Sequence, residues 1–247
     1  MSKLKNKICL VTGGTGLIGR EIINEFLYER AIVIFTFNKN ISEAKKICKL
    51  KKNLYYHKLN IAQKPSIKKL FKFIGKKFNK LDVIVNNAGI NKIDNIYNIK
   101  TEDWNKIQEI NLTGPMLLTK FVSKKMIKKR NGKILNISSI FGVVGKSKRS
   151  SYSSSKWGLI GLTKSTALDL AKYNILVNSI SPGVIESDLT TKILGKKGIQ
   201  EIQKLIPMKR LSKMSEIVHL IAFVVSDYNS YITGQNFIID GGYTSGW

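Results

Sequence analysis

Tyr152 and Lys156 lie four residues apart, and Ser139 precedes the tyrosine by thirteen residues. Residues i and i+4 share one face of a helix, so the phenol and the ammonium can point into one pocket. A free tyrosine has a pKa of about 10, and a nearby cation favours its phenolate, which suits the pair to acid–base chemistry near neutral pH. The same spacing also occurs in ordinary pairs on exposed helix faces, so the surrounding elements decide the interpretation.

A strand, a glycine-rich turn and a helix are predicted at the start of the chain. Residues 7–11 form a short apolar run, residues 12–19 are rich in glycine, and a helical pattern of apolar residues follows from Ile22 to Leu27. Such a turn lets the backbone approach a pyrophosphate, whose negative charge the start of a helix favours. The position between a strand and a helix favours nucleotide binding over a plain tight turn.

Further apolar runs alternate with amphipathic stretches, which is typical of a parallel sheet with helices on both faces. With four prolines, no internal repeat and no low-complexity linker, residues 1–247 are interpreted as one α/β domain. The strands expected after the first are 31–37, 54–59, 81–85, 132–137, 175–180 and 236–239.

Three more features follow at fixed places along the chain: Asn-Asn-Ala-Gly at 86–89, Asn111, and Ser-Pro-Gly at 181–183. Together with the glycine turn and the Ser139, Tyr152 and Lys156 set, they make residues 4–243 resemble the short-chain dehydrogenase/reductase family. The resemblance implies a single Rossmann-type, doubly wound parallel sheet of about seven strands. It also implies an NAD(P)-dependent oxidoreductase acting on CH–OH and C=O groups.

The resemblance assigns a role to each catalytic candidate. Tyr152 exchanges a proton with the substrate oxygen, Lys156 lowers the pKa of the tyrosine and holds the nicotinamide ribose, and Ser139 polarises the carbonyl. Asn111 holds a water that connects Lys156 to solvent. Ser138 is the alternative serine, but only Ser139 has the thirteen-residue spacing to Tyr152.

The cofactor residues implied by the resemblance come from the glycine turn, the catalytic pair and the ends of several expected strands. They are Gly13, Thr15, Gly16, Ile18, Gly19, Asn38, Lys39, Asn60, Ile61, Asn87, Ala88, Gly89, Tyr152, Lys156, Pro182, Gly183, Ile185 and Ser187. An acid after the second strand would bind the ribose 2′-OH and repel a 2′-phosphate. Asn38 and Lys39 stand there instead, which favours NADP(H) over NAD(H), although Gly16 occupies the place where many NADP-using relatives carry a base.

Residues 188–207 are rich in Lys and Gly and lack a strand pattern, so we expect a mobile lid over the substrate. A surface helix pair that contacts no ligand is the alternative. The resemblance further implies a homotetramer formed through the helices that contain Asn111 and Tyr152 and through the C-terminal strand.

Three functional classes fit these features. The leading one is an NADPH-dependent 3-oxoacyl-[acyl-carrier-protein] reductase of fatty acid synthesis, because Arg130 matches a basic position with which such reductases meet the acidic carrier protein. The second is a dehydrogenase of a sugar, a polyol or a nucleotide-linked sugar. The third is a non-catalytic binding protein, against which the complete set of Asn111, Ser139, Tyr152 and Lys156 argues.

The net charge of +26 arises from 42 Lys and Arg against 16 Asp and Glu. Such a charge attracts anionic partners, nucleic acid included, but here the lysines are spread over almost every expected helix, which favours a general composition bias. The spacing of the two cysteines does not suggest a disulfide framework. The chain also has no apolar run of membrane-spanning length and no signal-peptide pattern. These features indicate a cytoplasmic protein that does not enter a membrane. Neither His57 nor His219 has a ligand partner at useful spacing, so no metal site is expected.

Overall fold

A computed structural model of the chain describes residues 2–49 and 51–246, so Met1, Leu50 and Trp247 of the expected domain lie outside the described residues. Seven strands form one sheet in the order β3-β2-β1-β4-β5-β6-β7, and all neighbours in it are parallel. The strands are β1 (Ile8–Val11), β2 (Ile32–Phe37), β3 (Leu54–Lys58), β4 (Val83–Asn86), β5 (Gly132–Ile137), β6 (Ile175–Pro182) and β7 (Asn236–Ile239). This topology confirms the predicted doubly wound α/β fold.

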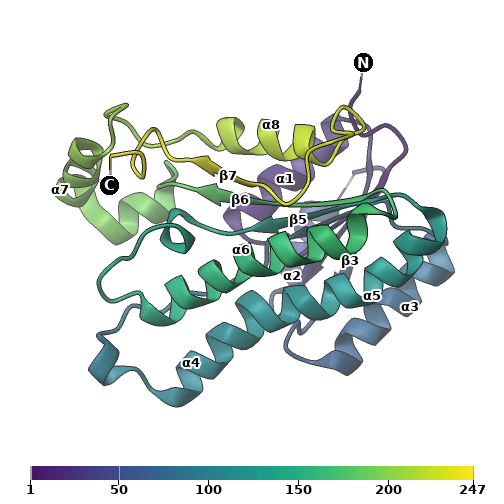
Figure 1. Cartoon of the computed structure of the whole chain (residues 1–247), viewed down its shortest axis with the longest axis horizontal. Coiled ribbons are helices and arrows are strands. Elements are labelled where there is room, and N and C mark those ends of the chain that lie inside the picture. Colours follow the sequence, from purple (N-terminus) through teal and green to yellow (C-terminus); the bar gives the residue numbers. More distant parts are fainter. Residues whose placement is uncertain (1, 50, 247) are drawn as a thin grey trace.

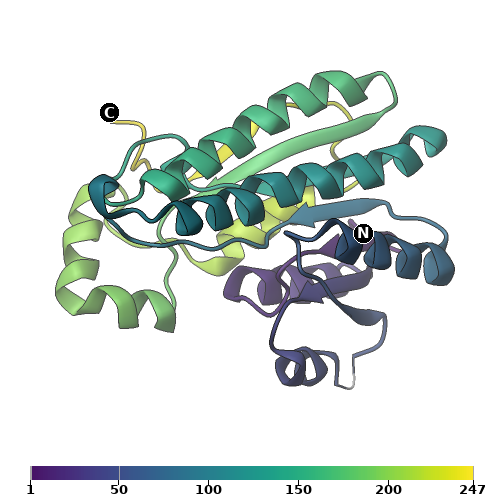
Figure 2. The same ribbon diagram turned by 90° about the horizontal axis from the view of Figure 1, so that it is seen from below.

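Helices connect the strands and cover both faces of the sheet (Figures 1 and 2). The α-helices are α1 (Leu17–Tyr28), α2 (Ile41–Cys48), α3 (Lys64–Phe78), α4 (Thr101–Gln108), α5 (Gly114–Lys129), α6 (Ser150–Ala171), α7 (Asp188–Leu205) and α8 (Met214–Val224). Three shorter helical segments are η1 (Ile96–Asn98), η2 (Glu109–Thr113) and η3 (Ile140–Gly142).

Two apolar cores lie on opposite faces of the sheet. Because successive residues of a strand point to opposite faces, Val33 and Phe35 of β2 enter the core under α1 and α8, whereas Ile34 enters the core under α3, α5 and α6. With both faces covered, β1 and the first three residues of β4 are apolar and buried, as expected for parallel strands.

Two strand boundaries differ from the expected ones. β4 begins at Val83 because Asp82 makes the preceding contacts with Ile8: its N–H donates to the Ile8 carbonyl at 2.9 Å, and its carboxylate accepts from the Ile8 N–H at 2.8 Å. β6 runs on to Pro182 because its last residues still pair with β7. The other expected strands agree with the structure to within one residue at each end.

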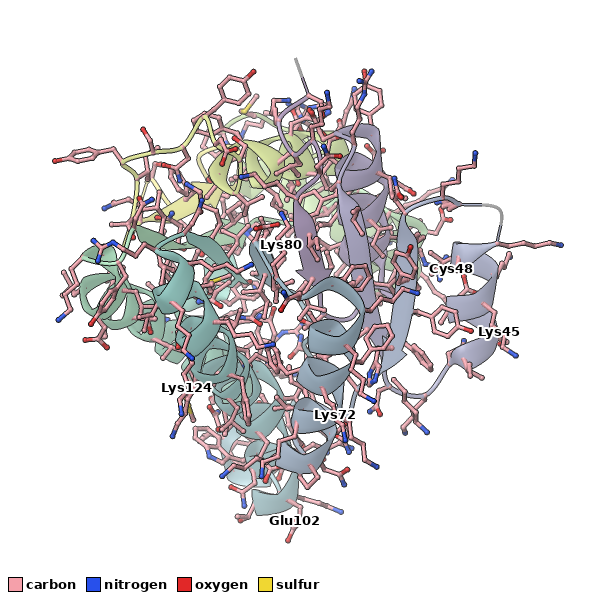
Figure 3. All side chains as sticks on the ribbon, turned by 90° about the vertical axis from the view of Figure 1, so that its right-hand side faces the viewer. Lys45, Cys48, Lys72, Lys80, Glu102 and Lys124 are labelled. Atoms are coloured by element: carbon pink, nitrogen blue, oxygen red, sulfur yellow. The ribbon has the colours of Figure 1, made fainter. Side chains whose placement is uncertain are left out.

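Basic side chains are distributed over several elements. On the side of the molecule shown in Figure 3, Lys45 comes from α2, Lys72 from α3, Lys124 from α5 and Lys80 from the segment before β4. Within residues 2–49 and 51–246, none of the helices combines the length and the apolar character needed to cross a membrane.

Candidate active site

A cavity of about 840 Å³ opens at the carboxyl edge of the sheet. Its lining comes from the segments after β1, β2, β3, β4 and β6, with contributions from Lys106 of α4, Ile110 of η2, and Leu189 and Thr190 of α7. Ligands of doubly wound sheets bind at this edge, where the strand order reverses, and here the order reverses between β1 and β4. The volume lies in the usual range for a small-molecule site.

The glycine turn after β1 has a backbone shape that suits a phosphate-bearing ligand. Gly13 has a φ of +67°, and a Cβ there would lie 2.9 Å from the Cα of Ala88. The Thr12 hydroxyl accepts hydrogen bonds from the N–H groups of Asn87 and Ala88, at 3.0 and 2.9 Å, and ties the turn to the end of β4. Gly16 stands at the start of α1 without a side chain to cap it, so first-turn N–H groups face the cavity side and can bind an anion.

Most of the predicted cofactor residues lie together around this cavity. The lining includes Gly13, Thr15, Gly16, Ile18, Asn38, Lys39, Asn60, Ile61, Asn87, Ala88, Gly89, Gly183, Ile185 and Ser187. Four predicted residues do not line it: Gly19, Pro182 and the two motif residues Tyr152 and Lys156. Gly19 lies behind the turn, where a Cβ would be 2.9 Å from the Cα of Gly14, and Pro182 is buried within β6.

Lys156 of α6 lies beside Gly89, which lines the cavity, and Tyr152 stands one turn earlier on the same helix. Lys156 is buried, its ammonium donates to the Ile137 carbonyl at 2.7 Å, and its Nζ lies 5.6 Å from the centre of the Tyr152 ring. The Ser138 hydroxyl donates to the carbonyl of Lys156 at 3.0 Å, so this serine holds α6 in place. The Ser139 hydroxyl accepts from the N–H of Phe141 at 3.2 Å, and its hydrogen-bonding influence lowers the pKa of the Tyr152 phenol.

Opposing influences act on the pKa of Tyr152. Burial raises the pKa of Tyr152, while hydrogen bonding from Ser139 and the positive charge of Arg149 lower it. Lys156 donates to a carbonyl oxygen, and burial lowers its own pKa to about 8; its expected effect on the pKa of Tyr152 stays a prediction. Arg149, whose positive charge lowers the pKa of Tyr152, precedes the tyrosine by three residues and was not among the residues predicted from the sequence.

Asn111 is held in η2, a single turn of π-helix between α4 and α5. Its Oδ1 accepts from the N–H of Ile90 at 2.9 Å, and its Nδ2 donates to the Ile90 carbonyl at 2.9 Å and to the Ser155 hydroxyl at 3.0 Å. Ser155 in turn donates to the Tyr152 carbonyl at 2.7 Å. Turns of π-helix are frequent at functional sites, and this one links Asn111 to the helix that carries the motif.

Gly89 keeps a small space open between two polar groups. A Cβ on this residue would lie 3.3 Å from Oδ1 of Asn111 and 3.7 Å from Nζ of Lys156. An acceptor and an ammonium therefore border the same point beside the cavity. A water or a ligand hydroxyl placed there can bridge Asn111 and Lys156. The family resemblance implies such a water, which would connect Lys156 to solvent.

Substituting Ser155→Ala is expected to lower kcat/KM about three- to tenfold, because Asn111 loses the hydrogen bond that fixes it to α6. The neighbouring Ser154 is exposed, so Ser154→Ala is the matched control and should leave the rate unchanged. Steady-state kinetics on both variants would check this. An equal effect of the two substitutions would contradict a role for Ser155 in positioning Asn111.

The segment expected to form a lid is the helix α7. At Gly195, with φ +64° and ψ 173°, the backbone leaves the helical conformation and divides α7 into two parts, and none of its residues is buried. Its first turn reaches the cavity through Leu189 and Thr190, whereas Ile193 and Leu205 are exposed. The segment is thus a surface helix pair whose beginning contacts the candidate site, and its mobility stays a prediction.

Arg130 lies at the opposite edge of the sheet from the cavity. It follows α5 and precedes β5, and α5 runs from the carboxyl edge back to the amino edge over sixteen residues, or about 24 Å. There its guanidinium donates to the Lys172 carbonyl at 2.9 Å. Arg130, which the resemblance singles out for a carrier protein, therefore lies beside Lys172 and away from the cavity of the same chain.

The cysteines and histidines occupy ordinary structural positions. Cys9 is a buried free thiol in β1, and Cys48 is a free thiol at the end of α2. The ring of His57 lies 5.1 Å from that of Phe73, and His219 is on α8. Across the described ranges, no group of three or more His, Cys, Asp or Glu residues could hold a metal ion.

Comparison with known proteins gives consistent matches along nearly the whole chain. The family model described as enoyl-(acyl carrier protein) reductase matches residues 16–244. The 3-oxoacyl-[acyl-carrier-protein] reductases FabG of Thermotoga maritima and Aquifex aeolicus are 37% and 38% identical, with 97% of this chain and 98% of each relative covered. Among solved structures, ElxO with NADP bound has a TM-score of 0.91 at 32% identity and covers 97% of this chain and 99% of its own.

Proposed function

The chain belongs to the short-chain dehydrogenase/reductase family, and we propose that it reduces the 3-oxo group of an acyl chain carried by acyl carrier protein, in fatty acid synthesis, with NADPH. It is an NAD(P)-dependent oxidoreductase of CH–OH and C=O groups. The observation that carries the proposal is the similarity to several 3-oxoacyl-[acyl-carrier-protein] reductases over almost the full length of both chains. The meeting of Tyr152, Ser139, Lys156 and Asn111 beside the cavity supports it.

The residues around the cavity fit a nicotinamide dinucleotide. The glycine turn and the open start of α1 suit its pyrophosphate, Asn38 and Lys39 its adenosine ribose, and Ile185 and Ser187 its amide end. We also propose that Asn60, Ile61 and the segment 87–89 line the adenine and the nicotinamide ribose. When bound, the cofactor supplies the hydride that reduces the carbonyl carbon.

Tyr152 donates the proton that the reduced carbonyl oxygen requires, and Ser139 donates a hydrogen bond to the same oxygen. Both groups hold the developing negative charge in a partly buried site, where hydrogen bonds to an oxyanion are stronger than in water. Arg149 favours the phenolate that remains after proton transfer. Lys156 and Asn111 border the point near Gly89 through which we expect that proton to be replaced from solvent.

NADPH is the proposed cofactor in preference to NADH. The segment directly after β2 carries no acid, and Lys39 lines the cavity there. The solved relative ElxO binds NADP, which supports the preference. We further propose one nucleotide-binding domain over residues 1–247, a substrate lid at 188–207, a homotetramer and a cytoplasmic location.

The direct test is turnover of an acetoacetyl thioester with NADPH, followed by loss of NADPH absorbance. Gluconate and a set of polyols with NADP provide the comparison, because a sugar or polyol dehydrogenase is the alternative. Turnover of the thioester at least tenfold more efficient than of any polyol is the expected result. The reverse order would contradict the proposed substrate.

The position of Arg130 bears on how a carrier protein could reach the site. A carrier bound at Arg130 and Lys172 faces the edge of the sheet opposite to the cavity of that chain. The thioester it carries is therefore delivered to another copy, which the proposed homotetramer supplies. The proposed partner is an acidic carrier protein, so charge steers its association with this basic chain. That association weakens as salt is added.

Substituting Arg130→Glu is expected to lower kcat/KM for a carrier-linked substrate about three- to tenfold at low ionic strength. The same change should leave kcat/KM for a small acetoacetyl thioester within about twofold, because no steering acts on it. Lys68→Glu, an exposed substitution on α3 with the same change in charge, is the control. Equal losses for both substitutions would show that net charge matters and that Arg130 has no special role.

A further inference from the structure

An acid that the sequence pattern does not reveal lies near the end of β2. Glu43 is in the first turn of α2, and its N–H donates to Oδ1 of Asn40, the residue that caps this helix, at 3.0 Å. Asn38, Lys39 and Asn40 line the cavity just before that turn. A carboxylate at this end of the site is of the type that repels a 2′-phosphate and favours NAD(H).

Arg20 neutralises that acid and joins it to the glycine turn. From the first turn of α1, its Nε donates to the Thr15 carbonyl at 3.1 Å, and its Nη2 lies 3.1 Å from Oε1 of Glu43. Thr15 also lines the cavity. The guanidinium therefore joins α2 to Thr15, which lines the cavity, although Arg20 and Glu43 themselves are not among the lining residues.

The pair is more suited to binding a ligand than to stabilising the fold. The side chains of Arg20 and Glu43 are 45% and 22% exposed, and an ion pair in contact with water contributes little to stability. A guanidinium has five N–H donors in a planar fork that matches a phosphate. With two of its nitrogens engaged, further N–H groups of Arg20 remain to face an anion at the edge of the cavity.

We infer that Arg20 is a specificity residue for the cofactor, which offsets Glu43 and provides a donor to the 2′-phosphate of NADP(H). The inference rests on the proposed use of NADPH and adds a second cation to Lys39. It also accounts for how a chain with Gly16 in its glycine turn can accept a 2′-phosphate beside a carboxylate. The charge of Arg20 takes the place of the base that is missing from the turn.

The test is a cycle of three variants, Arg20→Gln, Glu43→Gln and the double variant, with binding measured by calorimetry at low ionic strength. Adenosine 2′,5′-bisphosphate and AMP are the probes, since they differ only in the 2′-phosphate. Arg20→Gln is expected to weaken the bisphosphate about three- to tenfold and AMP less than about twofold. Glu43→Gln should bind the bisphosphate as tightly as the unsubstituted protein or more tightly, and adding it to Arg20→Gln should restore part of the lost affinity.

Arg30→Gln is the matched control, because Arg30 follows the other end of α1 and is exposed. Equal weakening of both probes by Arg20→Gln, or an equal effect of Arg30→Gln, would overturn the inference. A double variant that binds the bisphosphate no more tightly than Arg20→Gln would overturn it as well. The experiment measures binding and not turnover, so its result does not depend on the proposed acyl substrate. If the unsubstituted protein did not prefer the bisphosphate to AMP, both the NADPH preference and the inference would be refuted.

Discussion

Substituting Tyr152→Phe is expected to lower kcat by about 10² to 10⁴-fold, since the variant lacks the proton donor and keeps the ring. Ser139 and the charge of Arg149 both lower the pKa of the phenol. The dissociation constant for NADPH should change less than about threefold, because the cavity lining is unaltered. Single-turnover kinetics and a fluorescence titration of NADPH would measure the two quantities separately.

The control for this substitution is Tyr231→Phe, which removes the same oxygen from a tyrosine outside the site. Tyr231 is 95% exposed. Its kcat should equal that of the unsubstituted protein. A Tyr152→Phe variant that keeps more than about a tenth of the activity would show that another group donates the proton.

The fold could be predicted because each strand carries its own signal. A parallel strand covered on both faces is mainly apolar, and β1, β2 and the first three residues of β4 and of β6 have that pattern. The glycine turn could be placed because it stands between such a strand and a helix. Boundaries such as that at Val83 depend on a contact between Asp82 and Ile8, which are far apart in the sequence.

The candidate site could be predicted only in part, for the same reason. Motif spacing brings Tyr152 and Lys156 to one helix, but it does not tell that the ammonium binds the Ile137 carbonyl. The pair Arg20 and Glu43 joins two helices across the sheet edge, and no local pattern marks it. Ser155 stands inside the motif, yet its function depends on η2, which packs against α6.

Substituting Lys156→Met is expected to lower kcat/KM at least about 10²-fold and to raise the free energy of unfolding at pH 7. Burial lowers the pKa of Lys156 from 10.5 to about 8, a difference equivalent to roughly 3 kcal/mol. The Ile137 carbonyl loses its donor in the variant, which costs about 1 to 2 kcal/mol. A net gain of about 1 to 2 kcal/mol at pH 7 remains, and urea unfolding would measure it.

The gain should depend on pH in a definite direction. Because the folded pKa of Lys156 lies below its unfolded value, the unfolded state binds more protons between pH 8 and 10.5, and the unsubstituted protein gains stability relative to Lys156→Met across that window. The advantage of the variant is therefore full below pH 8 and declines as the pH rises toward 10.5. Lys164→Met, at an exposed position of α6, serves as the control and should show no such decline. A variant less stable than the unsubstituted protein at pH 7, or a difference that does not vary with pH, would mean that the ammonium of Lys156 is not penalised by burial.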